Sequence, residues 1–182
     1  MEATNFLPIE IETERLTLRK PRLEDAEAIF ATYSTDPEVT TFLTWKTHDN
    51  LQQTRDYLST CLAEWSSGAG YPYVITLKAK RDAPIGMIHA RMNNHGTNMG
   101  YVLAKTFWNK GYMTEALICL SDLLLSKESV FRVSSYCDVD NAASVCVMEK
   151  SGMLFEGILK RYSPLTNNAS EPRDCRMYAR TR

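Results

Sequence analysis

The turn at residues 108–113, Trp-Asn-Lys-Gly-Tyr-Met, carries the pattern of an anion-binding site. It follows an apolar, strand-like run at 99–103 and precedes a helix-like run at 113–125. When a strand enters a helix through a glycine such as Gly111, the first N–H groups of the helix have no partner within it. Together with the positive end of the helix dipole, they bind anions such as phosphate. We therefore predict that residues 109–114 bind the pyrophosphate of a nucleotide-containing cofactor.

Neither of the common nucleotide-binding loops is present at this turn. A Walker A loop needs two glycines five residues apart, followed by Lys and Ser or Thr. A dinucleotide-binding loop needs the order G-x-G-x-x-G, whereas Gly111 stands alone in the turn. A plain strand-to-helix turn therefore stays open as the alternative to an anion site.

A second strand-to-helix turn, at residues 138–144, reads Asp-Val-Asp-Asn-Ala-Ala-Ser. Asp140 or Asn141 can cap the helix by accepting hydrogen bonds from its free N–H groups. Alternatively, Asn141 and Ser144 face a ligand between two diverging strands, because residues three apart share one side of a helix. The Asn141 amide offers both a donor and an acceptor, which suits an amide-rich ligand.

The elements around the two turns form a mixed α+β pattern. Alternating apolar residues predict strands, and apolar positions three and four apart predict helices. Three consecutive strands with short turns favour an antiparallel meander. The strands are expected at 9–20, 71–77, 84–92, 97–103, 130–138, 153–162 and 175–180, and the helices at 23–34, 51–65, 114–126 and 141–150.

Composition sets the broad class of the chain. With 182 residues, 44% apolar and 24% charged, it has the size and balance of one globular domain. A net charge of −1 gives no bulk electrostatic basis for binding nucleic acid or a membrane surface. No signal-peptide pattern and no membrane-spanning apolar run of roughly 20 residues is present, which favours the cytoplasm. The five cysteines are expected to be reduced and buried, and the three histidines lack metal-ligand spacing, so no metal is expected.

The joint order of the motifs resembles the GNAT superfamily of acetyl-CoA-dependent N-acetyltransferases. The resemblance is carried by Tyr101-x-Leu, Asn109-Lys-Gly-Tyr-Met-Thr-Glu-Ala, Asp140-Asn-Ala-Ala-Ser, Glu149-Lys-Ser-Gly and Phe155-Glu-Gly. The opening Glu14-Arg-Leu-x-Leu-Arg and the ending Asp174-x-x-Met-Tyr-Ala-Arg are similar to the RimJ and RimL branch, which acetylates ribosomal-protein N-termini. The resemblance covers residues 9–180, which are expected to form one acetyltransferase domain.

The resemblance implies a mixed, mostly antiparallel sheet of seven strands with about four helices, in which strands four (97–103) and five (130–138) splay apart. Acetyl-CoA is expected in the gap as co-substrate, with its pantetheine arm pairing along strand four. Transfer to the amine is expected to be direct, in a ternary complex. The implied cofactor-binding residues are Tyr101, Val102, Leu103, Trp108, Asn109, Lys110, Gly111, Tyr112, Met113, Thr114 and Asn141, and the implied catalytic residue is Ser144.

Three positions depart from the pattern common in the superfamily. Trp108 and Met113 stand where it has Arg or Gln and Gly or Ala, but the expected contacts come from the backbone, so the site should tolerate both. Counted from Asn141, the place of the tyrosine that protonates the leaving thiolate holds Met148, which excludes a tyrosine acid on that helix. The RimL-like pattern has a serine in this role at the position of Ser144.

The residue that deprotonates the acceptor amine is not identifiable from the sequence. His89 has a suitable intrinsic pKa, but a structural role is the simpler interpretation. Asn98 and Ser163 stand where relatives carry a glutamate. Cys137 and Cys146 are the nucleophiles that an acyl-enzyme route would need, and we interpret them instead as small buried thiols.

The first hypothesis for the acceptor is the N-terminal α-amine of a protein or peptide. An α-amine has a pKa of roughly 8, against about 10.4 for lysine, and is easier to deprotonate. A small amine such as an antibiotic, polyamine or amino acid is the alternative enzyme substrate, and an acetyl-CoA sensor without turnover is the non-catalytic alternative. The aromatic residues Phe42, Trp45, Tyr71 and Tyr73 are assigned either to the acceptor site or to the core. No nucleic acid or membrane partner is expected, and a homodimer is left open.

Overall fold

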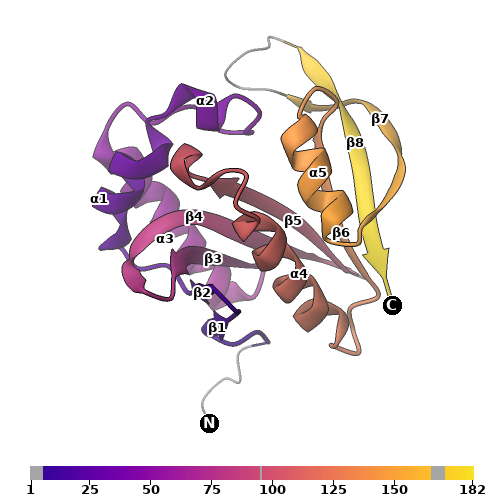
Figure 1. The fold of residues 1–182 in the computed structure, drawn as a ribbon, viewed down its shortest axis with the longest axis horizontal. Coiled ribbons are helices and arrows are strands. Elements are labelled where there is room, and N and C mark those ends of the chain that lie inside the picture. The colour runs from indigo at the N-terminus through magenta and orange to yellow at the C-terminus, as the bar shows by residue number, and fades with distance from the viewer. Residues whose placement is uncertain (1–5, 95, 165–170) are drawn as a thin grey trace.

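The computed structural model describes residues 6–94, 96–164 and 171–182, which form one eight-stranded sheet with helices on both faces (Figure 1). The strand order is β1-β2-β3-β4-β5-β6-β8-β7. The strands are β1 (Glu10–Glu12), β2 (Leu16–Arg19), β3 (Gly70–Leu77), β4 (Lys80–Asn93), β5 (Gly96–Leu103), β6 (Arg132–Asp138), β7 (Leu154–Pro164) and β8 (Pro172–Thr181). The helices are α1 (Asp25–Ile29), α2 (Pro37–Thr40), α3 (Leu51–Ser67), α4 (Tyr112–Leu125) and α5 (Ala142–Lys150), with a π-helical turn at Phe30–Ser34 and a 3-10 turn at Lys105–Phe107.

The α+β class is confirmed, with one more strand and one more helix than expected. The single strand expected at 9–20 is an antiparallel pair, β1 and β2. Thr13 closes the reversal, since its N–H donates to the Leu16 carbonyl at 3.0 Å and its hydroxyl oxygen accepts from the Leu16 N–H at 2.9 Å. The additional helix is the short α2, which overlaps residues 38–45, where the sequence predicts a short helical or irregular piece. Its N-cap Asp36 accepts a hydrogen bond from the Glu38 N–H at 2.8 Å.

The two faces of the sheet are covered by different helices. Val74 and Met87 pack with Leu58 of α3 and with α1, whereas their neighbours Tyr73 and Ile88 belong to the core that includes α4 and α5. This division follows from the alternation of side chains along each strand. The turn at 108–113 thus leads into the helix α4 on one face of the sheet, and α1 and α3 cover the other face.

Two of the four aromatic candidates for the acceptor site belong to the core. Tyr71 and Tyr73 are buried and meet Trp65 edge to face, with ring centres 4.9 and 5.2 Å apart. Trp45 is half-buried, with its ring centre 5.0 Å from that of His48. Phe42 is also half-buried, so Phe42 and Trp45 are the two of the four that lie partly at the surface.

The predicted splay is present between β5 and β6. These strands run parallel and pair only over residues 96–99 and 132–135. Beyond that point β5 continues beside β4 as far as Leu103, and β6 continues beside β8 as far as Asp138. In Figure 1 the two strands meet at the lower right and separate toward the top. The chain enters α4 from the end of β5 and α5 from the end of β6, so both strand-to-helix turns lie at the open end of the split.

Two further observations concern metal binding and membranes. Among the residues that the structure describes, no group of three or more His, Cys, Asp or Glu side chains is arranged to hold a metal ion. No helix within these described ranges is long and apolar enough to span a membrane.

Candidate functional site

The edge of β5 that faces the split carries backbone groups without a strand partner among the described residues. The Ala104 N–H donates to the Ile85 carbonyl of β4 at 2.8 Å, so alternation turns the backbone groups of Leu103 and Tyr101 away from β4. Pairing with β6 has ended before these residues. The Leu103 carbonyl accepts a hydrogen bond from the Trp108 indole Nε1 at 2.7 Å. Both backbone groups of Tyr101 and the Leu103 N–H therefore face the split, where an extended amide ligand could pair like an added strand.

Val102 lies between these two residues but faces the other way. It is the register partner of Met87, and the alternation turns its backbone groups toward β4. Its side chain packs against the core under α1 and α3. Val102 therefore supports the strand and does not form part of its open edge.

The turn after β5 leaves the beginning of α4 open. Asn109 and Gly111 have φ angles of 59° and 77°, a left-handed conformation that glycine adopts freely and asparagine tolerates. Gly111 is the N-cap of α4, and no side chain caps the helix there. The N–H groups of Tyr112, Met113 and Thr114 therefore lie at the positive end of the helix without an intrahelical acceptor. This is the backbone geometry of a phosphate site.

Two side chains of the turn leave that opening clear. Met113 is buried in the core at 4% exposure, so its bulk takes no room from a ligand. The Lys110 ammonium donates to the Thr106 carbonyl at 2.8 Å and lies 5.5 Å from the centre of the Phe107 ring. Both side chains therefore leave the N–H groups at the start of α4 uncovered.

An arginine from the beginning of the chain braces the turn. Arg15 donates from Nη1 to the Lys110 carbonyl at 2.9 Å and from Nε to the Glu115 carboxylate at 2.6 Å. That carboxylate also accepts from the Arg15 N–H at 2.8 Å and from the Thr13 hydroxyl at 2.5 Å. The guanidinium carbon lies 4.6 Å from the centre of the Tyr112 ring. Arg15 thus fixes both sides of Gly111 and places a positive charge beside the start of α4.

The second turn brings two hydroxyl groups together across the split. Asn141 caps α5 by accepting a hydrogen bond from the Ser144 N–H at 3.0 Å, which confirms the capping role. The Ser144 Oγ lies 2.6 Å from the Tyr101 hydroxyl, which also donates to the Ser144 carbonyl at 3.3 Å. Burial raises the pKa of Tyr101, and the hydrogen bond with Ser144 opposes that rise in part. Because Tyr101 belongs to β5 and Ser144 to α5, this contact joins the two sides of the split.

The Cys137 thiol lies beneath the same turn and is unsuited to nucleophilic attack. Burial raises the pKa of Cys137 to about 11, although a hydrogen bond with Ser144 acts in the opposite direction. Such a thiol is protonated near neutral pH and is a poor nucleophile. All five cysteines are free. Three of them are buried as predicted and Cys119 is half-buried, but the prediction is wrong for Cys146, which is exposed on the outer side of α5, opposite the core face of Met148.

On the opposite face of the sheet, Arg91 lies at the entrance to the split. Arg91 and Met87 are four residues apart on β4, and side chains at an even separation along a strand point to the same face. Both residues therefore lie on the face covered by α1 and α3. A Cβ atom on Gly100 would lie 2.8 Å from the Arg91 Nη1, which means that the guanidinium covers Gly100 directly. Gly100 is the first residue of β5 beyond the segment paired with β6.

His89 lies on this face but is not suited to act as a base. It is buried, with its Nε2 2.6 Å from the Glu64 Oε2. Burial lowers the pKa of His89 to about 3, and the charge of Arg91 acts in the same direction. An imidazole with so low a pKa accepts a proton poorly near neutral pH, so the structural interpretation of His89 is favoured. Asn98 donates from Nδ2 to the Ser134 hydroxyl at 3.5 Å and offers no basic group.

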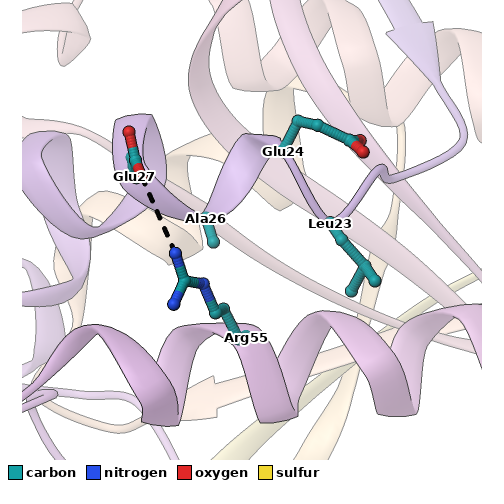
Figure 2. Close-up of a pocket in the computed structure, with 5 residues that line it drawn as sticks. All are labelled: Leu23, Glu24, Ala26, Glu27 and Arg55. Carbon is teal, nitrogen blue, oxygen red and sulfur yellow. Dashed lines mark ion pairs between the residues drawn. The ribbon is translucent and has the colours of Figure 1, made fainter.

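An open pocket between α1 and α3 lies apart from this site. It is lined by Leu23, Glu24, Ala26, Glu27 and Arg55, and Figure 2 shows Arg55 reaching toward Glu27, 3.7 Å away. None of these residues belongs to β5, β6, α4 or α5. The pocket therefore does not form part of the candidate site.

Three contributions to the site are absent from the sequence interpretation. In the sequence, Arg15 appears only as part of the opening motif of the resemblance. Tyr101 is expected to contribute its backbone and not its hydroxyl, and Arg91 belongs to no motif. Arg15 reaches residues 95 and 100 positions away, and Tyr101 reaches a residue 43 positions away. No local pattern signals contacts over such separations.

Comparisons with known proteins agree with this geometry. Residues 15–154 match the family described as an acetyltransferase (GNAT) domain. The uncharacterized N-acetyltransferase p20 of Bacillus licheniformis is 30% identical over 153 residues, which cover 82% of this chain and 85% of that protein. A GNAT-family acetyltransferase from Bacillus anthracis has a similar crystal structure, with a TM-score of 0.81 and 26% identity over 94% of this chain and 98% of that one. The crystal structure of RimL, a ribosomal L7/L12 alpha-N-protein acetyltransferase in complex with coenzyme A, has a TM-score of 0.81 at 21% identity over 96% of each chain.

Proposed function

The chain belongs to the GNAT acetyltransferase family and is an acetyl-CoA-dependent N-acetyltransferase, and on this premise we propose that it acetylates the N-terminal α-amine of a protein or peptide. RimL, which shares the fold, is described as an alpha-N-protein acetyltransferase, and this supports the proposed acceptor class. Transfer is direct, from donor to amine within one ternary complex.

The charge of the acceptor face carries this choice. Arg91 is exposed beside the split and forms no ion pair with any residue that the structure describes, while the Glu64 carboxylate contacts His89. A polyamine or an aminoglycoside carries several positive charges, which the Arg91 guanidinium repels. A peptide N-terminus carries a single positive charge, on an α-amine whose pKa is about 8 and which is therefore partly neutral near pH 7. This face therefore favours a peptide over a polycationic small amine.

The residues on the other face and in the split fit acetyl-CoA, which supplies the activated acetyl thioester. The uncapped N–H groups of residues 112–114, with the Arg15 charge beside them, fit a pyrophosphate. The backbone groups of Tyr101 and Leu103 fit the amides of a pantetheine arm. An N–H on this edge of β5 is also placed to stabilise the negative charge that develops on the thioester oxygen.

We assign protonation of the leaving sulfur to Ser144, with Tyr101 as its hydrogen-bond partner. As the C–S bond breaks, the Ser144 Oγ donates its proton to the sulfur, and the Tyr101 hydroxyl 2.6 Å away passes its own proton to Ser144. The proton that the acetylated amine releases restores the Tyr101 hydroxyl. Met148, at the place where many relatives carry a tyrosine, is fully buried and has no acidic group. In this chain a phenol therefore reaches the serine from β5 instead of from α5.

Thiol release from acetyl-CoA, measured across a panel of amines, tests the proposed acceptor. Peptides with a free N-terminus should be turned over, and the same peptides with a blocked N-terminus but free lysines should not. Faster turnover of a polyamine or an aminoglycoside than of every peptide would assign the enzyme to small amines. Tight acetyl-CoA binding without turnover of any amine would identify a sensor.

Replacing Arg15 with Ala should raise the KM for acetyl-CoA about 10- to 100-fold, the range expected for loss of hydrogen bonds to a charged group. With S-acetylpantetheine, which lacks the pyrophosphate, the same substitution should change KM less than about threefold. Thiol-release kinetics with both donors give the comparison. Arg81→Ala is the matched control because it removes an exposed arginine that pairs with Glu10 of β1. An equal rise in KM for both donors would show that Arg15 supports the fold and not the pyrophosphate site.

A further inference from the structure

Within the described ranges, the contacts of Arg91 set it apart from the other arginines. Among the described residues, every other arginine forms an ion pair or donates a side-chain hydrogen bond. Arg91 does neither, although it is exposed and lies beside several polar groups. The Glu64 carboxylate is close enough for the Arg91 charge to act on its pKa, but its Oε2 contacts the His89 Nε2 at 2.6 Å and it forms no ion pair with Arg91. The N–H donors of Arg91, which pair with no described residue, can therefore bind an anion from outside.

The position of Arg91 connects it with the reacting centre. Its Nη1 lies directly over Gly100, where β5 leaves β6 and the split begins. The donor elements α4 and α5 lie on the other face, so an acceptor amine must approach the split from the face that Arg91 occupies. An anion bound to the guanidinium would thus belong to the acceptor and lie close to its amine.

The groups around Arg91 come from elements on both sides of it. Burial raises the pKa values of Tyr57, Cys61 and Glu64 on α3 and of Tyr136 on β6, and the positive charge of Arg91 opposes the rise in all four. The guanidinium over Gly100 therefore acts on groups of both α3 and β6, around which part of the water is replaced by protein. Electrostatic attraction is stronger in such surroundings than in open water.

We propose that Arg91 binds a carboxylate of the acceptor, so that the preferred substrates are peptides with Asp or Glu at the second or third position. A guanidinium matches a carboxylate with two parallel hydrogen bonds. One residue spans at most about 3.6 Å, which places the side chains of the next two residues within reach of Arg91 when the amine is at the split. This inference rests on the proposed N-terminal acetylation and names the class of peptide.

Matched peptides measured with the parent enzyme and an Arg91 variant test the inference. Each acidic peptide is paired with its amide counterpart, Asp with Asn or Glu with Gln. The parent should prefer the acidic member at least about tenfold in kcat/KM, mainly through KM. Arg91→Gln should reduce that preference to below about twofold while still acetylating the amide peptides, and Arg91→Lys should retain part of it. Arg55→Gln, which removes an exposed arginine of α3 outside the split, should keep the full preference.

Two outcomes would overturn the inference and leave N-terminal acetylation standing. One is equal efficiency with acidic and amide peptides in the parent, and the other is an unchanged preference in Arg91→Gln. Failure to acetylate any peptide would instead refute the proposed acceptor class. In that case amino acids and their carboxamides form the matched pairs. A carboxylate preference that Arg91→Gln abolishes would then identify the α-carboxylate of a free amino acid as the bound anion, and equal rates would exclude an anion site.

Discussion

Replacing Gly111 with Asp is expected to weaken acetyl-CoA binding at least about 100-fold. The new carboxylate would lie at the start of α4, where the uncapped N–H groups of residues 112–114 and the charge of Arg15 favour an anion. Two like charges 4 Å apart repel by about 4 kcal/mol at an effective dielectric constant of 20, and 1.4 kcal/mol corresponds to a factor of ten. The carboxylate would also attract Arg15, because a Cβ on residue 111 lies 3.4 Å from its Nη2.

Gly111→Asn is the matched control for this substitution. Asn has the shape of Asp without its charge, and both tolerate the left-handed conformation, with φ at 77°, better than other residues do. The backbone cost and the close approach of the Cβ atom to the Arg15 Nη2 are therefore common to both variants. Calorimetric titration with acetyl-CoA should show Asp at least about tenfold weaker than Asn. Equal affinities in the two variants would mean that no anion binds at this end of α4.

Replacing Ser144 with Ala is expected to lower kcat about 100-fold or more, the usual range for loss of a positioned proton donor. The affinity for acetyl-CoA should change by less than about threefold, because the Ser144 N–H that Asn141 caps is retained. Single-turnover acetyl transfer and calorimetry measure the two quantities separately. Ser144→Thr keeps a hydroxyl at the same place and should recover most of the rate. Equal kcat in the parent and the Ala variant would remove Ser144 from the mechanism.

Tyr101→Phe tests the role of the Tyr101 hydroxyl independently of the strand backbone. The substitution keeps the ring and the backbone of Tyr101 and removes only the hydroxyl that lies 2.6 Å from Ser144. If the two hydroxyl groups act as one unit, the single variants and the double variant should lose kcat to a similar extent. Losses that multiply in the double variant would show that Tyr101 and Ser144 act independently.

The predictions that succeeded from the sequence concern short segments. The strand at 97–103, the glycine turn and the helix that follows were predicted within about two residues of β5 and α4. The capping role of Asn141 was also available from its place before an apolar helical pattern. Backbone conformation at such places depends on residues a few positions apart, so local pattern is sufficient.

The predictions that failed concern how segments meet. Residues 9–20 alternate like one strand, yet hydrogen bonds between Thr13 and Leu16 reverse the chain and add β1 to the edge of the sheet. Cys146 lies in an apolar run, yet the rotation of α5 turns Met148 toward the core and Cys146 outward. In both cases the outcome was decided by what the segment packs against.

The sequence by itself determined the fold class and the glycine turn that opens α4, because these depend on alternation or spacing within short segments. The splay of the two strands was implied only by the resemblance to the acetyltransferase superfamily. Only the tertiary structure decided which side chains complete the site. It brings Arg15 to the turn from 95 residues away, joins the hydroxyl of Tyr101 to Ser144 across the split, and leaves Arg91 over Gly100 without an ion pair to any described residue. The physical reason is that the register of the sheet and the placement of its helices set these distances, and neither is encoded within a single segment.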